Sequence, residues 1–346
     1  MLLKKNYDRE HLSAVAKQYP NLGINQLETT VFAFGLLQAL VDSGLPFCFK
    51  GGTSLLLLLE HPKRLSTDID IVVPKKIDFD TYFHRIKDRY PFLQGEERGK
   101  RSNAFRHFYF HPKSSLTSKD CVVNLDVAFE DDPFLETIEK EIAAPFLLTG
   151  GEKSYVKIPT PACILGDKLA AFAPHTLGVY PFATSLGNSC DNRLQVMKQL
   201  FDVAQLFDLA PSFDMVRSSY GHSVDFENRF RGTSFTMKDV LLDSLDAALC
   251  VASQGRRDPN QEYRQVFAPA LQPLNAHLFY GAYNQNAAAE DACKVVLLCA
   301  GLLKGVDIFH EHTILPNKSN LADFKYLHSE KAFQRIRQAL GLLDSK

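Results

Sequence analysis

The chain has 346 residues, of which 45% are hydrophobic and 23% are charged, and its formal net charge is −1. This composition is typical of a folded globular protein, and the near-zero net charge excludes a basic surface over the whole molecule, so that any nucleic-acid contact must be a local patch. The first residues carry several charges, no apolar run reaches the length of a membrane span, and the seven cysteines are scattered without metal-site spacing. We therefore expect a cytoplasmic protein with reduced thiols and no membrane contact.

The first predicted elements are two helices. One is predicted from about Asp8 to Gln18. A second begins at Asn25, with Glu28 three residues later as its capping-box partner, and Gly44 is its expected end. We interpret this second helix as packing structure that leads into the functional motifs.

A glycine-rich turn follows a short apolar strand at residues 47–49. Gly51 and Gly52 allow a sharp turn, and Thr53 and Ser54 open an apolar helix. The turn and the start of the helix would present backbone N–H groups together, which is an arrangement suited to an anion such as a triphosphate.

Two acids then stand one residue apart within an apolar run. In a strand, Asp68 and Asp70 point to one face, while Ile69 and Ile71 point to the other. Two adjacent carboxylates repel each other unless a cation lies between them, and Mg²⁺ prefers such oxygen ligands together with substrate phosphates. A phosphate-binding turn followed by a carboxylate pair predicts metal-assisted phosphoryl chemistry.

Two further strands are predicted at residues 105–111 and 121–129. The second contains Asp126, a third acid in an apolar segment, and Asn124 lies on the same face. From the residues alone, Asp126 is either a third member of the acidic site or an edge-strand acid that faces water.

From Thr160 the pattern becomes helical, so we predict a catalytic domain over residues 1–158 and a helical domain over 159–346. Lys168 lies on the first of these helices. Lys198 and Asp202 lie four residues apart on the next helix, where they would share a face. Taken alone, these residues are typical of surface lysines and a helix-stabilising charge pair.

These motifs together resemble the signature of the DNA-polymerase-β-type nucleotidyltransferase fold. Within that fold they are similar to the AbiEii/AbiGii-type nucleotidyltransferase toxins of bacterial toxin–antitoxin and abortive-infection systems. The resemblance rests on two segments in order, Lys50-Gly51-Gly52-Thr53-Ser54 and Arg64-Leu65-Ser66-Thr67-Asp68-Ile69-Asp70. It implies an α+β fold: a mixed sheet flanked by helices, followed by a mainly helical C-terminal domain.

The resemblance also implies a reaction: transfer of a nucleoside monophosphate from an NTP to an acceptor, with release of pyrophosphate. Asp68, Asp70 and Asp126 would bind Mg²⁺ or Mn²⁺, and Asp126 would take the proton of the acceptor hydroxyl. The residues expected to bind the nucleotide are Lys50, Gly51, Gly52, Thr53, Ser54, Arg64, Ser66, Lys168 and Lys198.

In the helical domain, the family has a Lys-Leu-x-Ala helix and a second motif that this chain matches incompletely. Lys168 matches the first motif, and it would neutralise charge on the triphosphate. Lys198 and Asp202 match the second, where Lys198 is either a phosphate contact or the ion-pair partner of Asp202, and Asp202 is a catalytic candidate. Gln199 stands where the family often has Asp.

Resemblance to the toxins further implies that the acceptor is RNA, such as the 3′ end of a tRNA, and that a cognate antitoxin protein restrains the enzyme in a type IV-like system. Two alternatives remain open from the residues. One is nucleotidylation of a small molecule or a protein. The other is a catalytically silent nucleotide-binding module, although a module that only binds has no need of three carboxylates.

Overall fold

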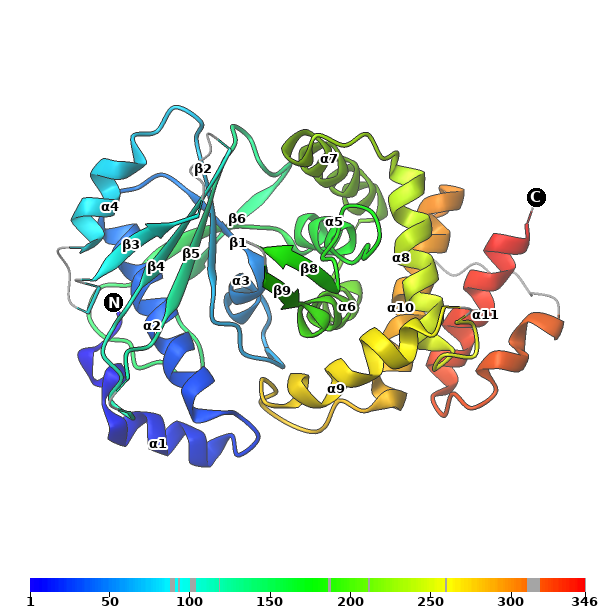
Figure 1. The fold of residues 1–346 in the computed structure, drawn as a ribbon, viewed down its shortest axis with the longest axis horizontal. Helices are drawn as coiled ribbons and strands as arrows, with labels where there is room; N and C mark the ends of the chain where they lie inside the picture. The colour runs from blue at the N-terminus through cyan, green and yellow to red at the C-terminus, as the bar shows by residue number, and fades with distance from the viewer. Residues whose placement is uncertain are drawn as a thin grey trace. The chain divides into compact units, whose positions relative to one another are not determined.

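The computed structural model describes residues 1–87, 91–92, 94–99, 104–117, 119–185, 188–210, 212–258, 260–309 and 318–345. The chain forms two compact units (Figure 1). Unit 1 comprises Met1–Thr160 with Ala276–Gly281, and unit 2 comprises Pro161–Asn275 with Ala282–Lys346. A short segment from far along the sequence therefore completes the first unit.

Unit 1 is built on a five-stranded mixed sheet. Its strands are β1 (Cys48–Lys50), β2 (Ile69–Val73), β3 (Gly95–Arg98), β4 (Phe105–Phe110) and β5 (Val123–Phe129). Their spatial order is β1-β2-β5-β4-β3, with β2 and β5 parallel and the other neighbours antiparallel (Figure 1). The predicted α+β class with a mixed sheet is confirmed.

The remaining elements of unit 1 surround this sheet. They are η1 (Lys4–Tyr7), α1 (Arg9–Gln18), α2 (Ile24–Asp42), α3 (Gly51–Leu58), α4 (Phe79–Lys87) and the hairpin of β6 (Thr137–Glu141) and β7 (Tyr155–Pro159). Helix α2 packs against β2 and β5, and it is apolar over most of its surface because it lies inside the unit.

The sheet has an apolar face and a polar face because the side chains alternate along each strand. On β5, Val123, Leu125 and Val127 are fully buried, whereas Asn124 and Asp126, between them, are only half-buried. The apolar side chains form the core with α2, which leaves the polar side chains on the opposite face, where chemistry can take place.

Glu28 does not have its predicted capping role. Helix α2 begins at Ile24, ahead of Asn25, and the Glu28 side chain is buried. Its carboxylate accepts hydrogen bonds from the backbone N–H of Ser115 and from the hydroxyl of Ser114, each at 2.7 Å. Glu28 therefore ties the loop between β4 and β5 to α2.

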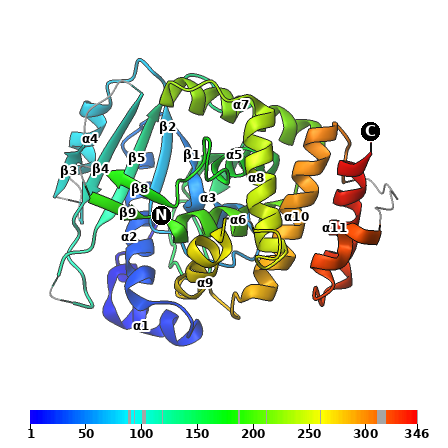
Figure 2. The same cartoon turned by 45° about the vertical axis from the view of Figure 1, so that its right-hand side comes forward.

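Unit 2 is mainly helical, as predicted. Its helices are α5 (Pro161–Ala171), α6 (Arg193–Phe207), α7 (Phe213–Arg231), α8 (Met237–Ala252), α9 (Ala268–Asn275), α10 (Gln285–Lys304) and α11 (Glu330–Asp344), with the π-helical turn η2 (Tyr263–Phe267), the 3₁₀ turn η3 (Lys318–Phe324) and the hairpin of β8 (Phe182–Ser185) and β9 (Asn188–Asp191). Helix α10 packs between α8 and α11 (Figure 2). Across the described ranges, none of the helices combines the length and apolar character of a membrane span.

Candidate active site

The turn between β1 and α3 passes directly against the carboxylate of Asp70. Gly51 has a φ of +77°, in the left-handed region where a side chain is strained. A Cβ built on Gly51 would lie 1.9 Å from Oδ2 of Asp70. Both the backbone conformation and the close approach therefore require glycine at this position.

Gly52 lies against two of the side chains that we predict to bind the nucleotide. A Cβ here would lie 2.8 Å from Oγ of Ser66 and 2.9 Å from Nη2 of Arg64. Arg64 is almost fully buried, and its Nη1 donates to the carbonyl oxygen of Leu65 at 2.9 Å. The fold thus brings Gly52, Arg64 and Ser66 together.

The segment Ala276–Gly281 holds this part of the chain in place. Arg64 forms a β-bridge with Leu278, and the N–H of Leu65 donates to the carbonyl oxygen of His277 at 2.7 Å. No local pattern in the sequence signals this contact, because the two segments are separated by most of unit 2.

The hydroxyls of Thr53 and Ser54 stabilise the turn itself. Both side chains are fully buried. Thr53 Oγ1 donates to the carbonyl oxygen of Asp68 at 2.5 Å, and Ser54 Oγ donates to that of Gly51 at 2.8 Å. Any contact of these two residues with a phosphate would therefore fall to backbone N–H groups in the first turn of α3, which have no partner within the helix.

Four polar side chains form a row across the sheet. Asp70 on β2 is the register partner of Lys50 on β1 and of Asp126 on β5. Asp126 is in turn the partner of His107 on β4. Directly opposed residues on neighbouring strands project to the same face, so these four side chains share the polar face. Since β5 lies between β2 and β4, the alternative of Asp126 as an edge-strand acid is wrong.

Two residues that the motifs did not single out hold the carboxylates. Nδ2 of Asn124 donates to Oδ1 of Asp68 at 2.9 Å, and Nδ1 of His107 lies 2.7 Å from Oδ1 of Asp126. The hydrogen bond to Asp126 raises the pKa of His107, outweighing the partial burial of the ring. Partners of this kind orient the carboxylates. The register of β4 against β5 creates the His107 contact, and no sequence motif reports it.

The three acids provide the hard oxygen donors that Mg²⁺ or Mn²⁺ prefers. Among the residues that the structure describes, no three His, Cys, Asp or Glu side chains are gathered into a ready-made metal cage. Mg²⁺ is usually held by one or two carboxylates together with waters and substrate phosphates. Asp68, Asp70 and Asp126 therefore suit a metal ion that binds along with a nucleotide.

Two of the predicted residues of unit 2 form a buried ion pair. Nζ of Lys168 on α5 lies 3.1 Å from Oδ2 of Asp202 on α6, and both side chains are buried. The same Nζ donates to Oε1 of Gln199 at 3.1 Å. Gln199 stands where the resembled family often has Asp. It contacts Lys168, but it brings no negative charge to the lysine. Lys198, on the same helix, is also buried.

Comparison with known proteins identifies the family. Residues 35–279 match the family model described as nucleotidyl transferase AbiEii toxin, type IV TA system. The chain belongs to the AbiEii family. It is therefore a member of a nucleotidyltransferase family of type IV toxin–antitoxin systems, and the predicted resemblance is confirmed.

Solved structures and curated proteins add little to this assignment. JHP933 from Helicobacter pylori is 14% identical to this chain, with a TM-score of 0.44. The match covers 81% of this chain and 94% of JHP933. An antigenic nucleotidyltransferase-like protein from Paracoccidioides brasiliensis is 14% identical to this chain, with a TM-score of 0.38. The match covers 59% of this chain and 91% of that protein. No curated protein matches the sequence.

Proposed function

We propose that the chain transfers a nucleoside monophosphate from an NTP to the 3′ end of an RNA, such as a tRNA, with the help of a divalent metal ion. The observation that supports this most directly is the alignment of Asp70 with Asp126 above Gly51. It puts two carboxylates of neighbouring strands beside a glycine turn whose backbone can approach phosphate.

In the proposed reaction, an acceptor hydroxyl oxygen bonds to the α-phosphorus of the NTP. The bond between that phosphorus and the oxygen that bridges to the β-phosphate breaks, and pyrophosphate leaves. Asp126 accepts the hydroxyl proton, while its hydrogen bond to His107 keeps the carboxylate oriented. A divalent metal bound by Asp68, Asp70 and Asp126 would supply charge neutralisation for the phosphates.

Other residues bind and position the nucleotide in this proposal. Backbone N–H groups at Gly52 and Thr53 donate hydrogen bonds to the phosphate oxygens, and Arg64 and Ser66 border that turn. Lys50, in the same row as Asp70, adds a positive charge on the polar face.

In unit 2, Lys168 and Lys198 would serve the triphosphate, and Asp202 would orient Lys168 through its ion pair. Gln199 contacts Lys168 but carries no charge, so it does not neutralise the lysine as an Asp at this position would. We infer that this leaves more positive charge for the phosphates.

The RNA acceptor and the restraining antitoxin rest on family membership alone. Toxins of type IV systems work beside a cognate antitoxin, and we propose such a partner for this chain.

Label transfer tests the proposal. The full chain is incubated with Mg²⁺ or Mn²⁺ and each of four α-³²P-labelled NTPs, separately with total RNA, bulk protein or no acceptor. Asp68→Ala/Asp70→Ala is the inactive variant, and Asp120→Asn, an exposed acid outside the site, is the matched control.

Label on a discrete RNA band, present with Asp120→Asn and absent with the double variant, supports the proposal and names the donor. Label on protein would overturn the RNA acceptor but not the reaction. Binding of NTP without any transfer would overturn the reaction and favour a nucleotide-binding module.

A further inference from the structure

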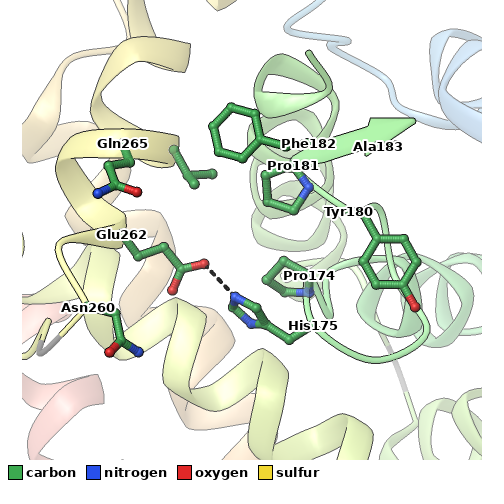
Figure 3. A pocket seen from close by; sticks show the side chains of 10 residues that line it. Pro174, His175, Tyr180, Pro181, Phe182, Ala183, Asn260, Glu262 and Gln265 are labelled. Carbon is green, nitrogen blue, oxygen red and sulfur yellow. Dashed lines mark ion pairs between the residues drawn. The ribbon is translucent and has the colours of Figure 1, made fainter. Parts of the chain in front are cut away.

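Unit 2 contains a pocket that none of the nucleotidyltransferase motifs explains. It has a volume of about 650 Å³, within the usual range for small-ligand sites. The segment 174–183 forms one wall and the segment 260–266, around η2, forms the other (Figure 3). The side chains that carry the argument are Tyr180, Phe182, His175, Glu262, Asn260 and Gln265.

One wall presents two aromatic rings that are unusually exposed. Phe182 is 58% exposed and Tyr180 is 40% exposed, although both line the pocket. The guanidinium of Arg193 lies 5.6 Å from the centre of the Phe182 ring. Arg193 is itself held by the carboxylate of Asp191 and by the carbonyl oxygen of Gln265. Phe182 is thus a supported ring with a large exposed surface, which is what a stacking platform requires.

Both walls provide polar groups, His175 from the segment 174–183 and Glu262 from the segment 260–266. Nε2 of His175 lies 3.0 Å from Oε1 of Glu262 (Figure 3). Its Nδ1 lies 2.8 Å from Oδ1 of Asp243. A carboxylate on each ring nitrogen favours the imidazolium form, which holds the Glu262 carboxylate in place. Asn260 and Gln265 add amide donors and acceptors on the wall that carries Glu262.

We propose that this pocket binds an unpaired nucleobase that carries an exocyclic amino group, as adenine, cytosine and guanine do and uracil does not. The base would stack on Phe182, and its amino group would donate to the Glu262 carboxylate. Aromatic stacking combined with hydrogen bonds to base edges is how proteins read single-stranded RNA. The inference rests on the proposed function, which supplies two sources of such a base, the NTP and the RNA acceptor.

The charges of the pocket disfavour other ligands. A bare phosphate would lie close to the carboxylate of Glu262, which lines the pocket and would repel it. A cationic side chain from a protein partner would be repelled by the arginines that already lie beside both rings. Arg231 lies 5.5 Å from the Tyr180 ring centre, as Arg193 lies beside Phe182. A neutral ring with amino donors meets neither obstacle.

Binding measured without transfer tests the inference. Fluorescence anisotropy follows labelled homopolymers of A, C or U, about six nucleotides long, with the full chain in excess chelator. ATP, CTP and UTP serve as unlabelled competitors. The variants are Phe182→Ala, Phe182→Tyr and Glu262→Gln, with Tyr155→Ala as a matched control because Tyr155 is 49% exposed and belongs to unit 1. Thermal melting checks that each variant is folded.

We expect the A and C oligomers to bind about tenfold more tightly than U, and Phe182→Ala to weaken A and C binding by about tenfold, as for the loss of one stacked base. Phe182→Tyr and Tyr155→Ala should bind as the wild type does. Glu262→Gln should remove the preference over U. Competition by ATP and CTP but not UTP would assign the base to the donor, and its absence would assign it to the RNA.

Equal affinity for A, C and U in the wild type would overturn the inference, as would unchanged binding by a folded Phe182→Ala. Capture of a basic peptide in place of the oligomers, lost in Phe182→Ala, would overturn it in favour of a protein partner. Base-selective binding without label transfer would refute only the proposed reaction. Label transfer without base-selective binding would refute only this inference.

Discussion

Replacing Gly51 with alanine places a methyl group where the carboxylate of Asp70 now lies. The new Cβ would be 1.9 Å from Oδ2 of Asp70, so that side chain has to move. The left-handed backbone costs a non-glycine residue about 1–2 kcal/mol. Overpacking in a closely packed region costs about 1–3 kcal/mol more. We therefore expect Gly51→Ala to lower the free energy of unfolding by about 2–5 kcal/mol, the sum of these two costs.

The same displacement should impair transfer more than stability. A misplacement of a catalytic group by about 1 Å commonly costs about a hundredfold in rate. Urea denaturation followed by circular dichroism measures the first effect, and initial rates of label transfer under conditions where the variant remains folded measure the second. Nucleotide binding, measured separately, distinguishes a lost rate from a lost substrate.

Gly44→Ala is the matched control. Gly44 has almost the same φ, +78°, but apart from its chain neighbours no residue has an atom within 4 Å of the position that a Cβ would take there. Gly44→Ala should lower the free energy of unfolding only by the backbone cost, about 1–2 kcal/mol, and should transfer label at the wild-type rate. If Gly51→Ala were no less stable than Gly44→Ala and transferred label at the wild-type rate, the argument that Asp70 packs on the turn would be refuted.

Three further predictions concern buried or paired charges. Glu28→Ala removes the acceptor that ties the loop between β4 and β5 to α2, and should lower the free energy of unfolding by about 2–4 kcal/mol in urea denaturation; a loss within measurement error would contradict the role of that carboxylate. Lys168→Met removes the ion-pair partner of buried Asp202 and should lower the free energy of unfolding by about 3 kcal/mol. If the broken pair is the cause, adding Asp202→Asn to the same chain should restore part of that free energy. The hydrogen bond of His175 to Asp243 and the charge of Glu262 raise the pKa of the ring despite its partial burial, so its stabilising effect is complete below the ordinary value of 6.5 and is lost as pH rises through the higher folded-state pKa. Thermal melts should therefore separate wild type from His175→Gln most at about pH 6 and least at about pH 9, and a gap that widened with pH would reverse the assigned sign.

The sequence alone was enough to predict the family, the fold class and the candidate carboxylates. These depend on local patterns. The alternation around Asp68 and Asp70 specifies a strand with one polar face, and the glycine pair before an apolar helix specifies a turn. The predicted start of the helical region near Thr160 follows in the same way from the proline that comes next, and α5 begins at Pro161. Local chemistry decides each of these features, so it can be read from neighbouring residues.

Which residues hold the carboxylates was decided only by the tertiary structure. His107 lies opposite Asp126 because β4 pairs with β5 in one register, and a shift by one residue would put it on the other face of the sheet. Glu28 looked like a capping residue because its spacing fits one, yet burial made it the acceptor of a distant loop. The pairing of Arg64 with Leu278 depends on the chain returning to unit 1. Such contacts join residues far apart in sequence, and their geometry exists only when the core has set the strand order and the packing of the helices against it.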